Sequence, residues 1–183
     1  MIIGVTGRIA TGKTTVANIF EKKGFFRIDA DKVYNDLRKS SEIMNIEILS
    51  RFGSLDKSII LKKIKNDKSA LSDLNKITHK YVVREIEKLV KVNHKNNIIL
   101  DVPVPVERGF SDLADLIIVT NCNRNTQINR IMKRDGENST SAETKVKMQS
   151  DEDYYRNLGD VIIETDAINE ADLEKIIEKE FII

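Results

Sequence analysis

The feature that most constrains this chain is a turn near its N-terminus that is bounded by two glycines. Gly7 and Gly12 enclose four residues and are followed by Lys13 and Thr14, which gives the spacing G-x-x-x-x-G-K-T. One apolar run precedes this turn and another follows it, as expected for a strand, a turn and a helix. Glycine has no Cβ, so the backbone here can bend tightly and approach an anion. Amide groups of the turn and of the helix N-terminus direct positive partial charge into one concavity, so the pattern predicts a phosphate-binding loop.

Each position of this loop has an expected role. Lys13 is expected to reach the β- and γ-phosphates of a nucleotide, and the Thr14 hydroxyl is expected to coordinate Mg²⁺. The alternative is an ordinary glycine-rich connection, but the flanking strand and helix are the elements that the motif requires. We therefore predict a nucleotide-phosphate site formed by Gly7, Ile9, Ala10, Thr11, Gly12, Lys13, Thr14 and Thr15.

Composition restricts the remaining classes of function. A hydrophobic share of 40% and a charged share of 32% in 183 residues are typical of one soluble globular domain. The net charge of +1 gives no strong field for nucleic acid or an acidic membrane. Cys122 is the only cysteine, so no intrachain disulfide can form, and we expect a small buried side chain there. The chain has no run of about 18 apolar residues and enters a strand directly, so we expect a cytoplasmic protein. The sequence leaves the oligomeric state open, with a monomer slightly favoured.

Predicted strands and helices alternate along the chain. We expect strands over residues 1–6, 25–28, 97–101, 116–120 and 160–164. We expect helices over residues 14–23, 32–38, 42–52, from 56 or 58 to 66, 69–93, 123–134, 141–157 and 169–180. This order favours an α/β fold with a five-stranded parallel sheet flanked by helices, as in nucleotide-kinase-like P-loop NTPases. The roughly sixty helical residues between the second and third strands are too many for one crossover, so they predict a helical insert beside the carboxyl edge of the sheet.

Three aspartates follow predicted strands. Asp29 and Asp31 close the second strand, and they share a face if the strand continues or lie around a turn if it ends. One of this pair can accept a proton from a substrate hydroxyl as phosphoryl transfer begins, and the alternative is a helix cap. Asp101 closes the third strand, the position of a Walker B acid that holds Mg²⁺ or its waters. The alternative for Asp101 is a residue that ends the strand in a turn before Pro103, without a role in metal binding.

Arginines and histidines provide further candidates. Arg130 and Arg134 lie four residues apart on one predicted helix face, where guanidinium groups can neutralise phosphate charge. The alternative is a solvated basic face. His79 lies on the long predicted helix, and His94 lies in a polar turn. Neither histidine has a cysteine or histidine partner at metal-ligand spacing, so we expect no metal site there.

Six segments in order and spacing resemble the dephospho-CoA kinase family, and the resemblance covers most of the chain. The phosphate-loop segment is shared by many NTPases, whereas the D-A-D, D-x-P-x-x-x-E and R-x-x-K-R-D-G segments are more specific to the family. The segments are G-R-I-A-T-G-K-T-T at 7–15, I-D-A-D-K-V at 28–33, T-H-K-Y-V-V-R-E at 78–85, L-D-V-P-V-P-V-E-R-G at 100–109, R-I-M-K-R-D-G at 130–136 and D-V-I-I-E-T at 160–165.

The resemblance implies ATP-dependent phosphorylation of the ribose 3′-hydroxyl of dephospho-CoA, the last step of CoA biosynthesis. It implies that Asp31 is the general base and that Lys13 and Thr14 serve ATP and Mg²⁺. It also implies a core over about 1–30, 94–123 and 157–183, a CoA-binding insert over about 31–93 with His79 facing substrate, and a lid over about 124–156 with Arg130 and Arg134 near phosphates. We also assign Asp101 and Pro103 to the substrate side of the site.

The sequence departs from the family pattern at four positions. Arg8 stands where a small residue is usual, and Lys80 follows His79 where proline is usual. Val83 stands where an arginine is expected, with Arg84 one place later. The lid arginine expected four residues before Gln149 is Lys145, which keeps the charge but loses the bidentate fork.

Three alternatives remain beside this interpretation. Another kinase of the nucleoside or nucleotide type would share the loop, lid and sheet but differ in the insert. A GTPase-like switch would need a guanine-reading N-K-x-D, and the segment at 75–78 fails at its fourth position, Thr78. A relative that binds nucleotide without catalysis is motivated by Val83 and Lys145.

Overall fold

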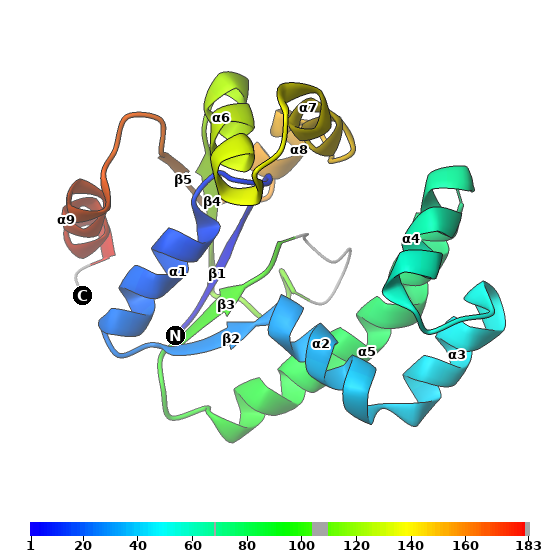
Figure 1. Ribbon diagram of the computed structural model, residues 1–183. Coiled ribbons are helices and arrows are strands. Elements are labelled where there is room, and N and C mark those ends of the chain that lie inside the picture. The colour runs from blue at the N-terminus through cyan, green and yellow to red at the C-terminus, as the bar shows by residue number, and fades with distance from the viewer. Residues whose placement is uncertain (68, 104–109, 182–183) are drawn as a thin grey trace. The chain divides into compact units, whose positions relative to one another are not determined.

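The computed structural model describes residues 1–67, 69–103 and 110–181, which form two compact units (Figure 1). The first, here called the sheet unit, comprises Met1–Asp29 and Asn93–Ile183. The second, here called the helical unit, is Ala30–Val92. Among the described residues, no helix combines the length and apolar character needed to cross a membrane.

The sheet unit is built on five parallel strands in the order β2-β3-β1-β4-β5, which confirms the predicted fold class. The phosphate loop follows the central strand, so strands protect β1 on both sides. The strands are β1 (Ile2–Gly7), β2 (Phe26–Asp29), β3 (Ile98–Asp101), β4 (Leu116–Asn121) and β5 (Val161–Glu164).

Both faces of the sheet are packed, because side chains of a strand alternate between its two sides. Ile118 of β4 joins the core formed with α1 (Lys13–Lys22) and α9 (Glu170–Phe181). Its neighbours Ile117 and Val119 pack instead with Tyr155 of α8 (Glu152–Arg156). The continuous apolar strands are therefore explained by burial on two faces.

Three helices lie between β4 and β5. They are α6 (Arg124–Asp135), α7 (Ser139–Lys147) and α8 (Glu152–Arg156). The prediction of one helix over 141–157 is wrong, because the chain breaks between α7 and α8. The carboxylate of Asp151 accepts a hydrogen bond from the Tyr154 amide and begins a new helix. The amide of Gln149, in the break, offers its oxygen to the phosphate loop.

The helical unit contains α2 (Ala30–Ser40), α3 (Glu42–Phe52), α4 (Lys57–Asn66) and α5 (Ala70–Val92). Ser41 caps α3 and Asp56 caps α4, each through a side-chain oxygen. One of its hydrophobic clusters has Met44, Ile48, Phe52, Ile60 and Ala70 buried at its centre.

The second strand does not continue past Asp29. The helix α2 begins at Ala30, which is two residues earlier than predicted, so Asp31 lies in its first helical turn. A carboxylate in the first turn of a helix is stabilised by the positive end of the helix dipole. The turn alternative for the Asp29 and Asp31 pair is therefore the one that the structure adopts.

Candidate active site

The backbone of the phosphate loop takes conformations that favour glycine. Gly7 has a φ of 146°, and a Cβ at this position would come within 2.4 Å of the Thr120 carbonyl oxygen. Gly12 has a φ of 101° and caps the N-terminus of α1. Ala10 also lies in the left-handed region, with a φ of 61°. The loop therefore carries one residue with a Cβ in a conformation that most side chains avoid.

Buried threonines support the loop from below. Thr11 is fully buried, and its hydroxyl lies 2.7 Å from the Thr120 hydroxyl and donates to the Arg8 carbonyl at 2.8 Å. The Thr165 hydroxyl, which follows β5, donates to the Thr11 carbonyl at 2.8 Å. These contacts join the loop to β4 and to the segment after β5, so its shape depends on positions far apart in sequence.

Lys13 lies across the loop that precedes it. Its Nζ donates to the carbonyl oxygens of Gly7 at 2.8 Å and Arg8 at 2.9 Å. Thr14 is exposed and Thr15 is half-buried in the first turn of α1. The positive ammonium group, the helix N-terminus and an accessible hydroxyl thus lie within three consecutive residues, which is the arrangement that an anion and its metal ion require.

Residues of α6 brace the loop from the side. Arg130 donates from Nη1 to the Ala10 carbonyl at 3.1 Å and from Nη2 to the Thr165 carbonyl at 2.6 Å. Gln127 is fully buried and donates to the Ile9 carbonyl at 2.9 Å. Arg130 was predicted to lie near phosphates, and the structure places its guanidinium against the loop's own backbone.

Sequence reasoning missed the supporting residues Thr120, Gln127, Gln149 and Thr165. Gln149 accepts a hydrogen bond from the Ile9 amide at 2.6 Å, so both backbone groups of Ile9 are bound by glutamine side chains. The only signal in the sequence was a polar residue within an otherwise apolar stripe, as at Gln127. Such a residue gives no indication of which loop it supports.

The second arginine predicted for a lid, Arg134, is bound within the segment that was predicted to form that lid. Arg134 donates to the neighbouring Asp135 from Nε at 2.7 Å. Lys145 of α7 contacts the same carboxylate at 2.8 Å and Glu137 at 2.8 Å. The hydrogen bond from Arg134 holds the pKa of Asp135 well below its usual range, with Lys145 adding to the effect. Arg134 and Lys145 are therefore brought together by one acid.

Two acids meet at the carboxyl ends of β2 and β3. Asp29 and Asp101 are partners in the strand register, and Arg27 lies 3.9 Å from Asp29 and 2.5 Å from Asp101. Burial raises the pKa of Asp101, while Arg27 and then Lys13 oppose that shift. The influence of Lys13 places this carboxylate within electrostatic range of the loop.

Pro103 lies two residues beyond Asp101 and is half-buried. Residues 104–109, which include Glu107 of the D-x-P-x-x-x-E segment, lie outside the described residues. In the helical unit, Asp31 is exposed on α2 and His79 is half-buried on α5. Asp31 and His79 thus belong to a different unit from the loop.

The donors predicted for Mg²⁺ are one hydroxyl and one carboxylate. Among the residues that the structure describes, no group of three histidines, cysteines or acids forms a metal cage. Oxygen donors from Thr14 and Asp101 nevertheless fit Mg²⁺, which binds few protein ligands and completes its shell with water and substrate phosphates.

Arg8 fills the position where the family pattern has a small residue. Its Nε is buried and has no hydrogen-bond partner in the described part of the chain. The charge of Arg8 contributes to lowering the pKa of Glu152, although Arg156 is the larger cause. The Arg8 charge therefore lies within electrostatic range of α8.

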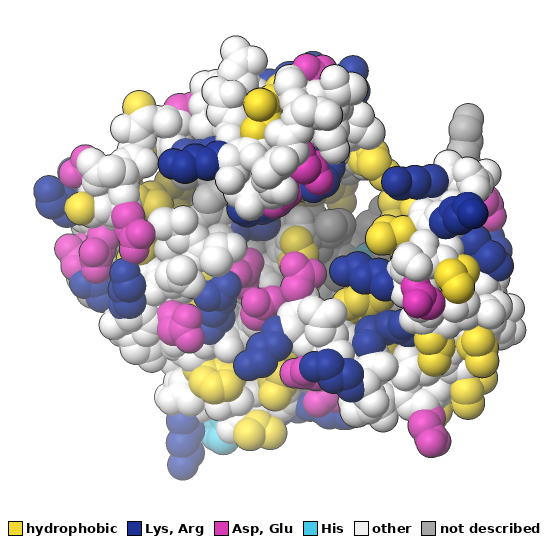
Figure 2. All heavy atoms as spheres, viewed as in Figure 1, with side chains coloured by type: hydrophobic (Ala, Val, Ile, Leu, Met, Phe, Trp, Pro, Cys, Tyr) yellow, Lys and Arg dark blue, Asp and Glu magenta, His cyan; other side chains and the backbone are white. Residues whose placement is uncertain are grey.

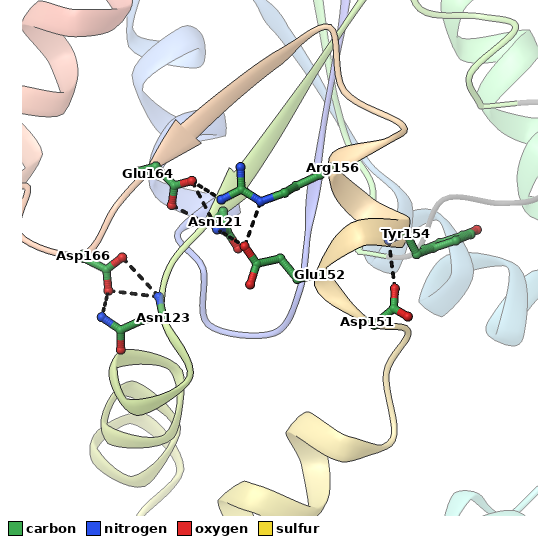
Figure 3. A network of polar contacts seen from close by, with 8 residues as sticks. All are labelled: Asn121, Asn123, Asp151, Glu152, Tyr154, Arg156, Glu164 and Asp166. Carbon is green, nitrogen blue, oxygen red and sulfur yellow. Dashed lines mark hydrogen bonds and ion pairs between the residues drawn. The ribbon is translucent and has the colours of Figure 1, made fainter.

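A polar network holds α8 against the strand ends (Figure 3). The Asn121 amide donates to Glu152 at 2.9 Å and to Glu164 at 3.0 Å, and Arg156 binds both acids. Nearby, the Asp166 carboxylate accepts a hydrogen bond from the backbone N–H of Asn123 at 3.0 Å. These contacts fix both ends of the segment from α6 to α8 on the sheet unit.

Cys122 lies just beyond β4, beneath the loop. It is buried and free, with its sulfur 3.9 Å from the Ala10 carbonyl oxygen. Burial raises the pKa of its thiol, which confirms the prediction of a small buried side chain and disfavours a reactive thiolate.

The fold and the loop define a kinase of the P-loop class, and comparisons with known proteins specify it further. The sequence model of the dephospho-CoA kinase family matches residues 1–171. The chain belongs to the dephospho-CoA kinase family. A dephospho-CoA kinase of Fusobacterium nucleatum is 37% identical over 98% of this chain and 96% of its own.

Solved structures agree with this assignment. A dephospho-CoA kinase from Campylobacter jejuni superposes with a TM-score of 0.68 and 26% identity, covering 98% of this chain and 94% of its own. The protein TT1252 from Thermus thermophilus superposes with a TM-score of 0.82, covering 100% and 96%. At 22% identity, the second comparison supports the fold alone.

Proposed function

We propose that this enzyme transfers the γ-phosphoryl group of ATP to the ribose 3′-hydroxyl of dephospho-CoA, forming CoA and ADP. The observation that carries the proposal is the phosphate loop with Lys13 across it, in a chain whose family model spans residues 1–171. The relatives from Fusobacterium nucleatum and Campylobacter jejuni are both named dephospho-CoA kinases.

The chain's own groups divide the reaction between them. Loop amides and Lys13 bind the β- and γ-phosphates and neutralise charge as the bond to ADP breaks. Asp31 accepts the proton of the 3′-hydroxyl while the oxygen bonds to the γ-phosphorus. Thr14 and Asp101 hold Mg²⁺, which supplies charge stabilisation at the phosphate oxygens when bound.

The segment from α6 to α8 serves as the lid in this proposal. Arg130 and Arg134 carry the charges that face ATP phosphates on closure, and both are bound to groups of the sheet unit here. Closure exchanges these internal contacts for contacts to phosphate and excludes water from the transfer. His79 and Pro103 help to bind the acceptor, dephospho-CoA.

An ADP-release assay tests the function. We expect efficient ADP release from ATP with dephospho-CoA, and much weaker release with nucleosides and nucleoside monophosphates. A nucleoside or nucleotide that outperforms dephospho-CoA would instead support the other small-molecule kinases. ATP binding without turnover of any acceptor would support a non-catalytic relative.

A further inference from the structure

Arg27 of β2 is a largely buried charge that has no part in the reaction described above. Its Nη2 donates to Oδ2 of Asp101 on β3 at 2.5 Å, whereas Asp29 lies farther away, at 3.9 Å. The side chains of Arg27 and Asp101 are only 16% and 9% exposed. The geometry of such a pair matters, because removal of one partner leaves the other charge buried without compensation.

The sheet explains how Arg27 comes to face Asp101. Asp29 and Asp101 are register partners, and Arg27 precedes Asp29 by two residues, so the three side chains share one face of the sheet. Ile99, the register partner of Arg27, belongs to the core that includes residues of α1. The face that carries Arg27 is therefore the one that α1 covers, and Figure 2 shows basic side chains beside acidic ones over α1 and β2.

The second arm of the guanidinium group binds α1. Nη1 of Arg27 donates to Oδ1 of Asn18 at 2.6 Å and lies 3.5 Å from the exposed carboxylate of Glu21. Asn18 lies five residues beyond Lys13, on the helix that begins at the phosphate loop. One planar group thus joins the carboxylate of Asp101 to the helix that carries Lys13.

The third nitrogen of Arg27 shows what this orientation serves. Its Nε is buried and has no hydrogen-bond partner in the described part of the chain. A buried N–H without an acceptor is destabilising, so the side chain does not lie where its own hydrogen bonding is best satisfied. Both Nη groups are used instead, each on a different element, which the fixed fork of arginine allows and the single ammonium group of lysine does not.

We propose that Arg27 is a positioning residue that fixes the carboxylate of Asp101 in the orientation that Mg²⁺ requires. Arg27 binds Oδ2 and so leaves Oδ1 as the oxygen for the ion. Its bond to Asn18 keeps that oxygen aligned with the helix that carries Thr14, the other proposed ligand. This inference rests on the proposed function, because it takes Asp101 as a magnesium ligand.

Three variants test the separate contacts of Arg27. Arg27→Lys keeps the positive charge but cannot bridge Asp101 and Asn18 together. Asn18→Ala removes only the anchor on α1, and because Asn18 is exposed, its loss is expected to leave the fold intact. Glu21→Gln is the matched control, since it removes an exposed ion pair of the same guanidinium group. Circular dichroism and urea unfolding check the fold of each variant.

The measured quantity is the dissociation constant of Mn²⁺, used as the probe for Mg²⁺. Electron paramagnetic resonance follows free Mn²⁺ in the presence of a non-hydrolysable ATP analogue, with enzyme in excess so that all of the analogue is bound. We expect Arg27→Lys to raise this constant about tenfold or more, as for other residues that orient a metal ligand. We expect Asn18→Ala to raise it by less and Glu21→Gln to keep it. An unchanged constant in Arg27→Lys would overturn the proposal.

A double variant separates positioning from a merely structural role. If Arg27 acts through Asp101, then Arg27→Lys should add little to the Mn²⁺ constant once Asp101→Asn is present, because contacting residues that act as a unit are not additive. Additive effects of the two substitutions would mean that Arg27 acts independently of Asp101, which contradicts the positioning role.

The metal measurement needs no acceptor, so it separates a failure of this inference from a failure of the function. Wild-type turnover of dephospho-CoA, with unchanged Mn²⁺ binding in Arg27→Lys, overturns the positioning role and leaves the function intact. Mn²⁺ binding that is weakened by Arg27→Lys, in an enzyme that does not turn over dephospho-CoA, overturns the function and supports the positioning role. Absence of both Mn²⁺ binding and turnover in the wild type overturns both.

Discussion

The sheet unit and the helical unit hold their functional groups by different means. In the sheet unit, the loop is fixed by its backbone and by buried hydroxyls such as Thr11 and Thr120. In the helical unit, the proposed groups are helical side chains, with Asp31 exposed and His79 half-buried. Binding of phosphate by backbone amides tolerates little variation, whereas exposed side chains on a helix can be exchanged, which lets one nucleotide-binding core serve different acceptors.

The largest effect is expected on the helical side. Asp31→Asn keeps the shape of the side chain but cannot accept the proton, so kcat should fall by about 10²–10⁴-fold. ATP affinity, measured by calorimetry, should stay near that of the wild type because the loop is untouched. The exposed Asp36→Asn on the same helix is the control. Normal turnover of Asp31→Asn at saturating substrates would assign the base elsewhere.

The next effect is expected in the loop. Lys13→Ala removes the ammonium group that lies 2.8 Å from the Gly7 carbonyl, and kcat/KM should fall about 100-fold or more. Lys22→Ala, at the other end of α1, removes an exposed lysine paired with Glu170 and should leave turnover unchanged. A folded Lys13→Ala protein with near-normal kcat/KM would contradict the role of the loop.

A third change separates metal from base. Asp101→Asn should raise the Mg²⁺ concentration that half-maximal activity requires, because a proposed ligand for the ion is weakened. Titration of Mg²⁺ at saturating ATP measures this, with Asp31→Asn as the comparison that should keep the wild-type midpoint. If Asp101→Asn is inactive at every Mg²⁺ concentration while Asp31→Asn is active, the two roles are reversed.

The smallest effect concerns the stability of the helical unit in acid. Arg51 lies 2.8 Å from Asp67 and 2.7 Å from Asp73, and its hydrogen bond is the main cause that lowers the pKa of Asp67 from 3.8 to about 2. A lowered pKa contributes stability above the ordinary value, and that stability is lost as pH falls toward the folded value. Arg51→Ala should therefore be less stable than wild type at about pH 6, with a smaller difference at about pH 3.

Urea unfolding followed by circular dichroism at both pH values measures that difference, with Lys62→Ala as an exposed control. The pair is exposed, so salt should reduce the effect further. A difference between Arg51→Ala and wild type that is equal at both pH values would mean that Arg51 acts through packing alone.

The contrast between the units also explains what the sequence could predict. The loop was predictable because Gly7 and Gly12 mark backbone geometry that few other residues adopt. The strands were predictable because burial on two faces makes them continuously apolar. The break between α7 and α8 was not, since Asp151 reads as one more polar residue in a polar segment until its cap contact to Tyr154 is seen.

Contacts between distant segments were also beyond the sequence. The sequence predicts that Arg130 contacts phosphate, yet in the structure its guanidinium binds the Ala10 and Thr165 carbonyls. That arrangement depends on how β4, β5 and α6 meet, which no local pattern contains. The roles of Asp31 as general base and of His79 as a residue facing substrate come from the family resemblance, and they remain predictions.

The position of the transferred phosphate tests the central claim most directly. The enzyme is incubated with ATP and dephospho-CoA, and the product is analysed by phosphorus and carbon NMR. The account predicts one new phosphomonoester coupled to the ribose 3′ carbon, with one ADP formed for each. A phosphate on the 2′ carbon or on the pantetheine arm, or ADP accompanied only by inorganic phosphate, would contradict it.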